Sequence, residues 1–140
     1  MYSVLEWPGA KGRAVPKAPT VIQYGKTGFK WGYELDRTTE EKIEGIKLLL
    51  DPEQPRPIYL PETNTKAELQ KLGKPALDVA TDYIESISQH ALKKIEGSYP
   101  KEYIEMLSKH FILSVPAVWS DKAKDATLRV RVRRNIRSRR

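Results

Sequence analysis

Five apolar or small residues follow one another at 111–115 (FILSV) and lead into Pro116. The polar segment beyond them opens with Ser120 and Asp121, residue types that favour the N-cap and first turn of a helix. A short apolar run in front of a helix start indicates a buried strand that feeds a helix. We therefore predict a strand at 111–115, a helix capped by Ser120 and Asp121, and packing of the remaining chain around this junction.

A second pattern predicts a long helix that starts at Pro75 and ends at Gly97, with acids early and lysines late. Its apolar stripe recurs every three or four residues and consists of Leu77, Ala80, Ile84, Ile87, Ala91 and Ile95. Asp78, Asp82 and Glu85 lie off this stripe. We expect them to form one solvated face rather than a catalytic pair, because nothing suggests the burial that separates two pKa values.

A shorter helix is predicted over 100–108, with Tyr103, Ile104 and Leu107 facing inward. This helix would deliver the chain into the strand at 111–115. His90 is expected at an edge or on the surface of the long helix.

The amino-terminal half has strand character. Residues 20–24 (TVIQY) are rich in β-branched side chains, 29–35 (FKWGYEL) alternate apolar and polar residues, and Gly25–Gly28 between them favours a turn. We predict an antiparallel hairpin with an aromatic face. Such a face is typical of a half-buried sheet, and an aromatic platform for a ligand is the alternative.

The next segment is ambiguous. A helix could start at Thr38 and Thr39 and continue through the following isoleucines, or the LLL run at 48–50 could form a short strand. Residues 51–64 contain four prolines, which exclude a regular helix and a central strand. We expect 51–64 to be a connector.

The composition fits one modest domain of 140 residues. Cysteine is absent, which excludes disulfides, thiolate metal sites and thiol nucleophiles, and two histidines without a ligand cluster predict no metal site. No apolar stretch approaches the roughly 20 residues that span a bilayer, and no leader pattern opens the chain. We expect a soluble cytoplasmic protein that does not associate with membranes.

The net charge of +7 is concentrated at one end. Seven of the 25 basic residues are arginines in 129–140, so the other 18 balance the 18 acidic residues of the remaining chain. The body of the protein is therefore neutral, and any attraction for nucleic acid would come from this tail. The sequence also lacks the GxxxxGK[ST], GxSxG and HExxH motifs, which leaves P-loop, hydrolase and zincin chemistry without residues.

The segment at 115–127 (VPAVWSDKAKDAT) resembles the strand-to-helix segment of the heat shock protein 70 family, and more closely that of divergent fungal members with an actin-like ATPase domain. In that family VPA precedes aromatic residues, an Asn-Asp cap, a helical arginine and Ala-Thr. Further pieces agree in order over about residues 4–128. They are WPG at 7–9, PTVIQY at 19–24, KWGYE at 30–34, KLLLDP at 47–52, and the long helix with Ala80, Asp82 and Tyr83.

The resemblance implies roles for three residues. The family relays its nucleotide state through the proline and the arginine of this segment. Pro116 matches the proline, and Lys124 stands at the place of the arginine, where it keeps the charge without the planar fork of donors. A lysine before an apolar strand is the family's catalytic lysine, and Lys47 is its loose counterpart. The alternative for Lys47 is an ordinary exposed lysine.

The resemblance further implies ATP and Mg²⁺ as cofactors, held between two lobes by glycine-rich loops with aspartates. Neither a DxGTT-like nor a DxGGG-like loop occurs in the sequence, so the nucleotide-binding residues are not identified. We expect an α/β fold that is part of an actin-like, ribonuclease-H-like ATPase lobe, with a mixed sheet and flanking helices in 1–128. Such a fragment would not be a competent ATPase alone, and its partners would be the remainder of the domain or client proteins.

The tail at 129–140 (RVRVRRNIRSRR) departs from the family, whose helix continues with small apolar residues to Ala-Gly. We interpret it as a disordered or aberrant tail that arose from a shifted frame or mis-splicing. The alternative is a basic arm for nucleic acid or an acidic membrane surface. The chain would then be a small nucleic-acid-binding module, and a protein-interaction module is a further possibility.

Overall fold

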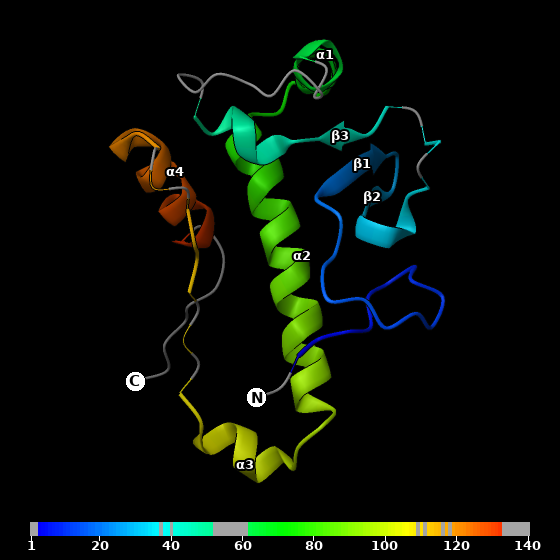
Figure 1. The fold of residues 1–140 in the computed structure, drawn as a ribbon, viewed down its shortest axis with the longest axis vertical. Helices are drawn as coiled ribbons and strands as arrows, with labels where there is room; N and C mark the ends of the chain where they lie inside the picture. The colour runs from blue at the N-terminus through cyan, green and yellow to red at the C-terminus, as the bar shows by residue number, and fades with distance from the viewer. Residues whose placement is uncertain are drawn as a thin grey trace.

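A computed structural model describes residues 3–36, 38–39, 41–51, 62–108, 110, 112–115, 117 and 119–132. Pro116, most of the proline-rich connector, and the tail beyond residue 132 lie outside the described residues. A single long helix, α2 (Ala76–Glu96), runs through the molecule (Figure 1). Its start after Pro75 and its end at Gly97 confirm the helix predicted from the apolar stripe.

A small antiparallel sheet lies on one side of α2. Its strands are β1 (Val21–Gly25), β2 (Gly28–Trp31) and β3 (Ile43–Glu44), in the spatial order β2-β1-β3. The hairpin and its turn are confirmed, with Ile22 opposite Trp31 in the β1–β2 register. The general α/β class is therefore correct, whereas the expected mixed sheet is wrong because every described strand pair is antiparallel.

The second hairpin strand ends earlier than predicted. The chain leaves β2 after Trp31 and forms a 3-10 turn, η1 (Gly32–Glu34). Gly32 has a φ of +61°, a left-handed conformation that glycine adopts without a steric cost. The predicted aromatic face is only partly buried. Trp31 is 8 % exposed, whereas Phe29 is 38 % exposed.

The ambiguous segment after the hairpin follows neither of the two predictions. Instead of a helix from Thr38 or a strand at 48–50, the structure has the short strand β3 followed by a 3-10 helix, η2 (Ile46–Leu49). Gly45 before η2 is left-handed, with a φ of +63°, and turns the chain there. Ile43 and Ile46 on either side of it are both buried.

Helix α1 (Glu62–Leu72) was not predicted, and it begins inside the segment assigned as a connector. Its first residue follows Pro61, a residue type that helices tolerate only at their start. Helix α3 (Lys101–Met106) confirms the short helix of 100–108 and buries Ile104, but Tyr103 and Leu107 are half exposed rather than inward.

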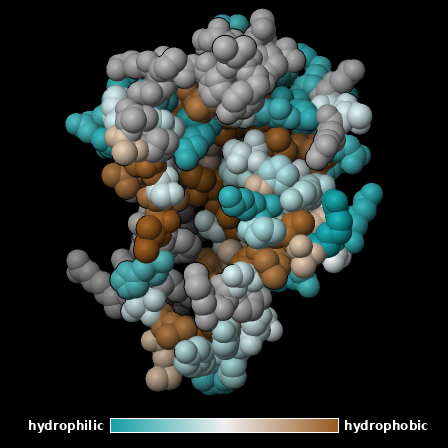
Figure 2. Space-filling view, viewed as in Figure 1, coloured by the Kyte–Doolittle hydropathy of each residue, from teal (hydrophilic) through white to brown (hydrophobic). Residues whose placement is uncertain are grey.

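The predicted strand before the last helix is wrong for the residues described. Residues 112–115 belong to no strand, and Ile112 is 93 % exposed. In Figure 1 this segment climbs from α3 toward α4 without joining the sheet, and Figure 2 shows hydrophobic surface on that side of the molecule. An apolar run forms a strand only where a neighbouring strand accepts its backbone hydrogen bonds, and the three described strands lie across α2.

Helix α4 (Asp121–Val132) packs along α2 on the side opposite the sheet (Figure 1). It starts where Ser120 and Asp121 predict a helix start. It also continues through residues 129–132, so the first part of the predicted disordered tail is helical.

The main core lies between the sheet and the first half of α2. Its buried members are Ile22, Trp31, Ile43, Ile46, Val79, Ala80 and Tyr83. Within the described ranges, no helix combines the length and the apolar character needed to cross a membrane.

Candidate functional site

Two of the residues singled out from the sequence, Lys47 and Ser120, lie where η2 approaches the amino end of α4. We call this place the η2–α4 junction and define it by Lys47 and Asp51 on one side and Trp119 and Ser120 on the other. Asp51 follows η2, is 1 % exposed, and was not predicted as a site residue. Trp119 is 4 % exposed, so each of the two segments buries one side chain at the junction.

Two hydrogen bonds join the segments directly. The backbone N–H of Ser120 donates to Oδ2 of Asp51 over 3.1 Å, and the Ser120 hydroxyl donates to Oδ1 over 3.2 Å. Ser120 Oγ also accepts the N–H of Ala123 at 3.3 Å, which is the N-cap hydrogen bond of α4. The predicted cap at Ser120 is therefore confirmed, and it is shared with a residue 69 positions earlier in the chain.

The start of α4 is fixed by packing as well. Ala123 is 1 % exposed and Thr127 is 7 % exposed, and the Thr127 hydroxyl donates to the carbonyl of Ala123 over 3.0 Å. These two residues face the same way along one turn of the helix. The first turns of α4 consequently cannot rotate without moving buried atoms.

Lys47 lies at the open side of the junction. Its Nζ is 5.5 Å from the centre of the Trp119 ring, a cation–π distance, and the residue is exposed. The structure thus brings the candidate catalytic lysine next to the segment that resembles the family's switch. The same contact also agrees with the alternative interpretation, in which Lys47 is an ordinary exposed lysine packed on an aromatic ring.

Lys124 and Asp121 lie further along the surface of α4. Lys124 Nζ is 3.2 Å from Oδ1 of Asp121, whose side chain is fully exposed. Asp121 therefore adds a negative charge to the first turn, where the helix dipole favours it, while Ser120 makes the N-cap bond. Pro116, the other residue with an implied switch role, lies outside the described residues.

A second polar cluster joins the hairpin to α2. Asp82 Oδ2 accepts the Tyr24 hydroxyl at 2.6 Å and also binds the ammonium of Lys74, which lies 4.4 Å from the centre of the Tyr24 ring. The side chain of Asp82 is only 18 % exposed, so its assignment to a solvated face is wrong. Burial and the neighbouring Asp82 carboxylate raise the pKa of Tyr24 well above its usual range, which excludes this hydroxyl as a base.

A third feature confirms His90 as an edge residue. Its Nε2 lies 2.7 Å from the carbonyl oxygen of Glu6, and its ring is 5.5 Å from that of Trp7. Nearby Lys94 binds the Glu6 carboxylate at 2.5 Å and lowers the pKa of that exposed group. These contacts hold the amino-terminal segment against α2.

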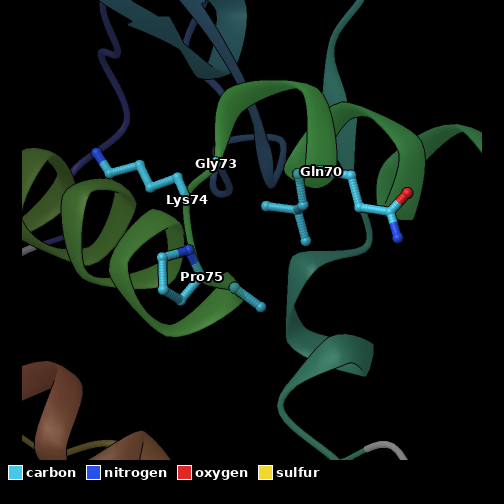
Figure 3. Close-up of a pocket in the computed structure, with 6 residues that line it drawn as sticks. Gln70, Gly73, Lys74 and Pro75 are labelled. Carbon is cyan, nitrogen blue, oxygen red and sulfur yellow. The ribbon is translucent and has the colours of Figure 1, made fainter.

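One open cavity of about 380 Å³ lies between α1 and α2. Its lining is largely apolar and consists of Leu69, Gln70, Gly73, Lys74, Pro75 and Ala76. In Figure 3 the ammonium end of Lys74 points away from Gln70, so charged groups do not converge in this cavity. It lacks the convergent polar groups of a substrate site.

Two observations on the described residues bear on nucleotide binding. Lys47 lines no part of the cavity between α1 and α2. No group of three or more His, Asp or Glu side chains comes together in the described ranges as metal ligands would. The η2–α4 junction therefore remains the candidate site. Its contacts fix the position of η2 relative to the amino end of α4.

Comparison of the chain with protein families, with curated proteins and with solved structures yields no match.

Asp51 is the site residue that sequence reasoning missed. It follows three leucines and precedes the proline-rich connector, where an acid resembles an ordinary boundary residue. One signal was present, because the predicted helix has a serine N-cap but Ala123 at the third position. A capping box needs Glu or Gln there, so the N-cap N–H is left to water or to an acceptor from another segment.

Proposed function

We propose that the chain is a segment of the nucleotide-binding domain of a heat shock protein 70-like, actin-like ATPase. In this proposal its parent protein couples ATP binding and hydrolysis, with Mg²⁺, to a chaperone-like conformational change. The segment supplies Lys47 and the helix α4 to a site whose phosphate-binding loops belong to the remainder of the domain.

Contacts among the separate pieces of the resemblance support this proposal. WPG meets KWGYE, since the rings of Trp7 and Trp31 are 6.3 Å apart and a Cβ on Gly9 would lie 2.4 Å from the Tyr33 carbonyl. PTVIQY meets the long helix, since the Tyr83 hydroxyl donates to the carbonyl of Pro19 over 2.8 Å. Pieces that are distant in sequence thus pack on one another.

The observation that carries the proposal is the η2–α4 junction. Asp51 belongs to KLLLDP, and Ser120 belongs to the segment that contains Pro116 and Lys124. Their two hydrogen bonds, with Lys47 over Trp119, join the candidate catalytic lysine to the candidate switch helix. A relay between nucleotide and helix requires such a joint.

The chain alone should not hydrolyse ATP, because the sequence holds neither phosphate loop. Magnesium-dependent turnover by the purified 140-residue chain that is lost in Lys47→Ala would contradict this part of the proposal.

A chimera tests the proposal in the positive direction. Residues 4–128 replace the corresponding segment in an intact ATPase domain of the heat shock protein 70-like family, which supplies both loops. We expect magnesium-dependent ATP hydrolysis that Lys47→Ala reduces by about 100-fold or more. The matched control Lys26→Ala, an exposed lysine in the hairpin turn, should keep the activity. A folded chimera that fails to bind ATP would overturn the proposal.

Nucleic-acid binding through the basic tail is the second candidate. Helix α4 extends through residue 132, so the first arginines belong to a helix anchored by buried Ala123 and Thr127. Binding of RNA or DNA should weaken as salt rises and should vanish in a chain ended at Leu128. Undiminished binding by the shortened chain would exclude this role for the tail.

A further inference from the structure

The N-cap of α4 is completed by a distant residue. In a capping box, the side chain at the third helical position accepts the N–H of the N-cap residue. Ala123 occupies that position and has no acceptor. The N–H of Ser120 is instead accepted by Asp51, from the end of η2.

The packing explains why the acceptor comes from another segment. Ala123 is 1 % exposed, and a glutamate in its place would push a charged side chain into packed atoms. Asp51 reaches the same N–H from the side and, at 1 % exposure, has both carboxyl oxygens satisfied by Ser120. Its position at the amino end of α4 is also the one that the helix dipole favours for an acid.

We propose that Asp51 is a positioning residue that locks η2, and with it Lys47, to the amino end of α4. Lys47 stands four residues before Asp51, and Trp119 immediately precedes Ser120. The Asp51–Ser120 bonds therefore hold the Lys47 ammonium over the Trp119 ring. A displacement of α4 moves Lys47, and a displacement of Lys47 moves α4.

The functional consequence of this inference rests on the proposed function. If Lys47 is catalytic and α4 is the switch helix, Asp51 couples the two mechanically. The test of the inference needs no nucleotide, so the inference and the proposed function can fail separately. If the chimera fails but the coupling is measured, the joint stands without the ATPase role. If the chimera hydrolyses ATP but the coupling is absent, the ATPase role stands without Asp51.

The experiment measures Lys47 by NMR in the full chain. Protons above an indole ring resonate upfield of their usual position, so the ε-methylene of Lys47 reports its distance from Trp119. We expect Asp51→Asn, which keeps the shape of the side chain, to abolish most of this upfield displacement. The amide signal of Ala123 should move in the same variant, because its acceptor Ser120 loses a fixed orientation.

The matched control is Asp82→Asn, which changes a partly buried carboxylate that also accepts a hydroxyl hydrogen bond. It should leave the Lys47 and Ala123 signals in place, because Asp82 binds Tyr24 and Lys74 instead. A merely stabilising role for Asp51 would lower the unfolding midpoint without moving either signal in the folded state. Unchanged Lys47 and Ala123 signals in folded Asp51→Asn would overturn the proposal.

Ser120→Ala provides a second variant should Asp51→Asn not fold. It removes the hydroxyl bond to Asp51 from the other side of the junction, and the Lys47 displacement should again shrink. Retention of the full displacement in Ser120→Ala would equally overturn the proposal.

Discussion

Asp51 and Asp82 are two largely buried acids that accept hydrogen bonds from hydroxyl groups. They differ in the other groups that bind each carboxylate and in its exposure to water. Asp82 binds a cation, Lys74, together with the Tyr24 hydroxyl, in a cluster that is partly open to water. Asp51 is almost fully buried and receives the N–H and O–H of Ser120 at a helix start. The Asp82 cluster is a partly exposed ion pair that fastens the hairpin to α2. The Asp51–Ser120 bonds fix the position of η2 relative to α4.

This difference predicts unequal costs when each acid is removed. Asp51→Ala should lower the free energy of unfolding by about 3 kcal/mol, because two partly buried donors of Ser120 lose their acceptor and a buried side chain is removed. Chemical denaturation followed by circular dichroism measures the loss. The control Asp121→Ala changes a fully exposed acid in the same region and should cost no more than about 0.5 kcal/mol.

Asp82→Ala should cost less, about 1 to 2 kcal/mol. Lys74 has a third of its side chain exposed and can turn its ammonium to water once the carboxylate is gone. The same denaturation measurement ranks the two variants. If Asp82→Ala lowered the free energy of unfolding more than Asp51→Ala, the proposed difference between the two acids would be contradicted.

Alkaline pH should destabilise the protein in part through the Asp82 cluster. Burial first, and then the Asp82 carboxylate, raise the pKa of Tyr24 in the folded state. A raised folded pKa contributes stability that is present below the unfolded value of ~10 and is lost as pH rises above it. Thermal unfolding from pH 9 to 11 should therefore show falling stability, with a shallower slope in Tyr24→Phe. Buried Tyr83, whose pKa is also raised, keeps part of the slope in that variant.

The smallest effect is expected at Lys47. Lys47→Met removes a cation from an exposed contact with Trp119 and should change the unfolding free energy by at most about 0.5 kcal/mol. The same substitution should abolish ATP hydrolysis in the chimera. A large loss of stability would mean that Lys47 serves the fold, and its catalytic role would lose support.

Local signals explain what the sequence allowed us to predict. The stripe of α2 with Pro75 and Gly97 at its ends, the glycine turn after β1, and the Ser120 cap all depend on neighbours within a few residues. Such features can be predicted from the sequence because they do not depend on contacts with distant residues.

The failures depend on partners distant in sequence. Residues 112–115 have the composition of a strand but no strand beside them in the described chain, and composition cannot supply one. Asp82 was placed in solvent because Lys74 and Tyr24 approach it only after the hairpin packs on α2. Asp51 escaped notice because its partner Ser120 is 69 residues away.

A double-mutant cycle between Asp51 and Ser120 tests the joint most directly. Unfolding free energies are measured for the original chain, Asp51→Ala, Ser120→Ala and the double variant. The two side chains share only the hydroxyl bond, since the Ser120 N–H and the N-cap bond to Ala123 each depend on one of them alone. We expect the second substitution to cost less once the first is present, which gives a coupling energy of about 1 kcal/mol or more. Additive losses within about 0.3 kcal/mol would contradict the claim that these two residues join η2 to α4.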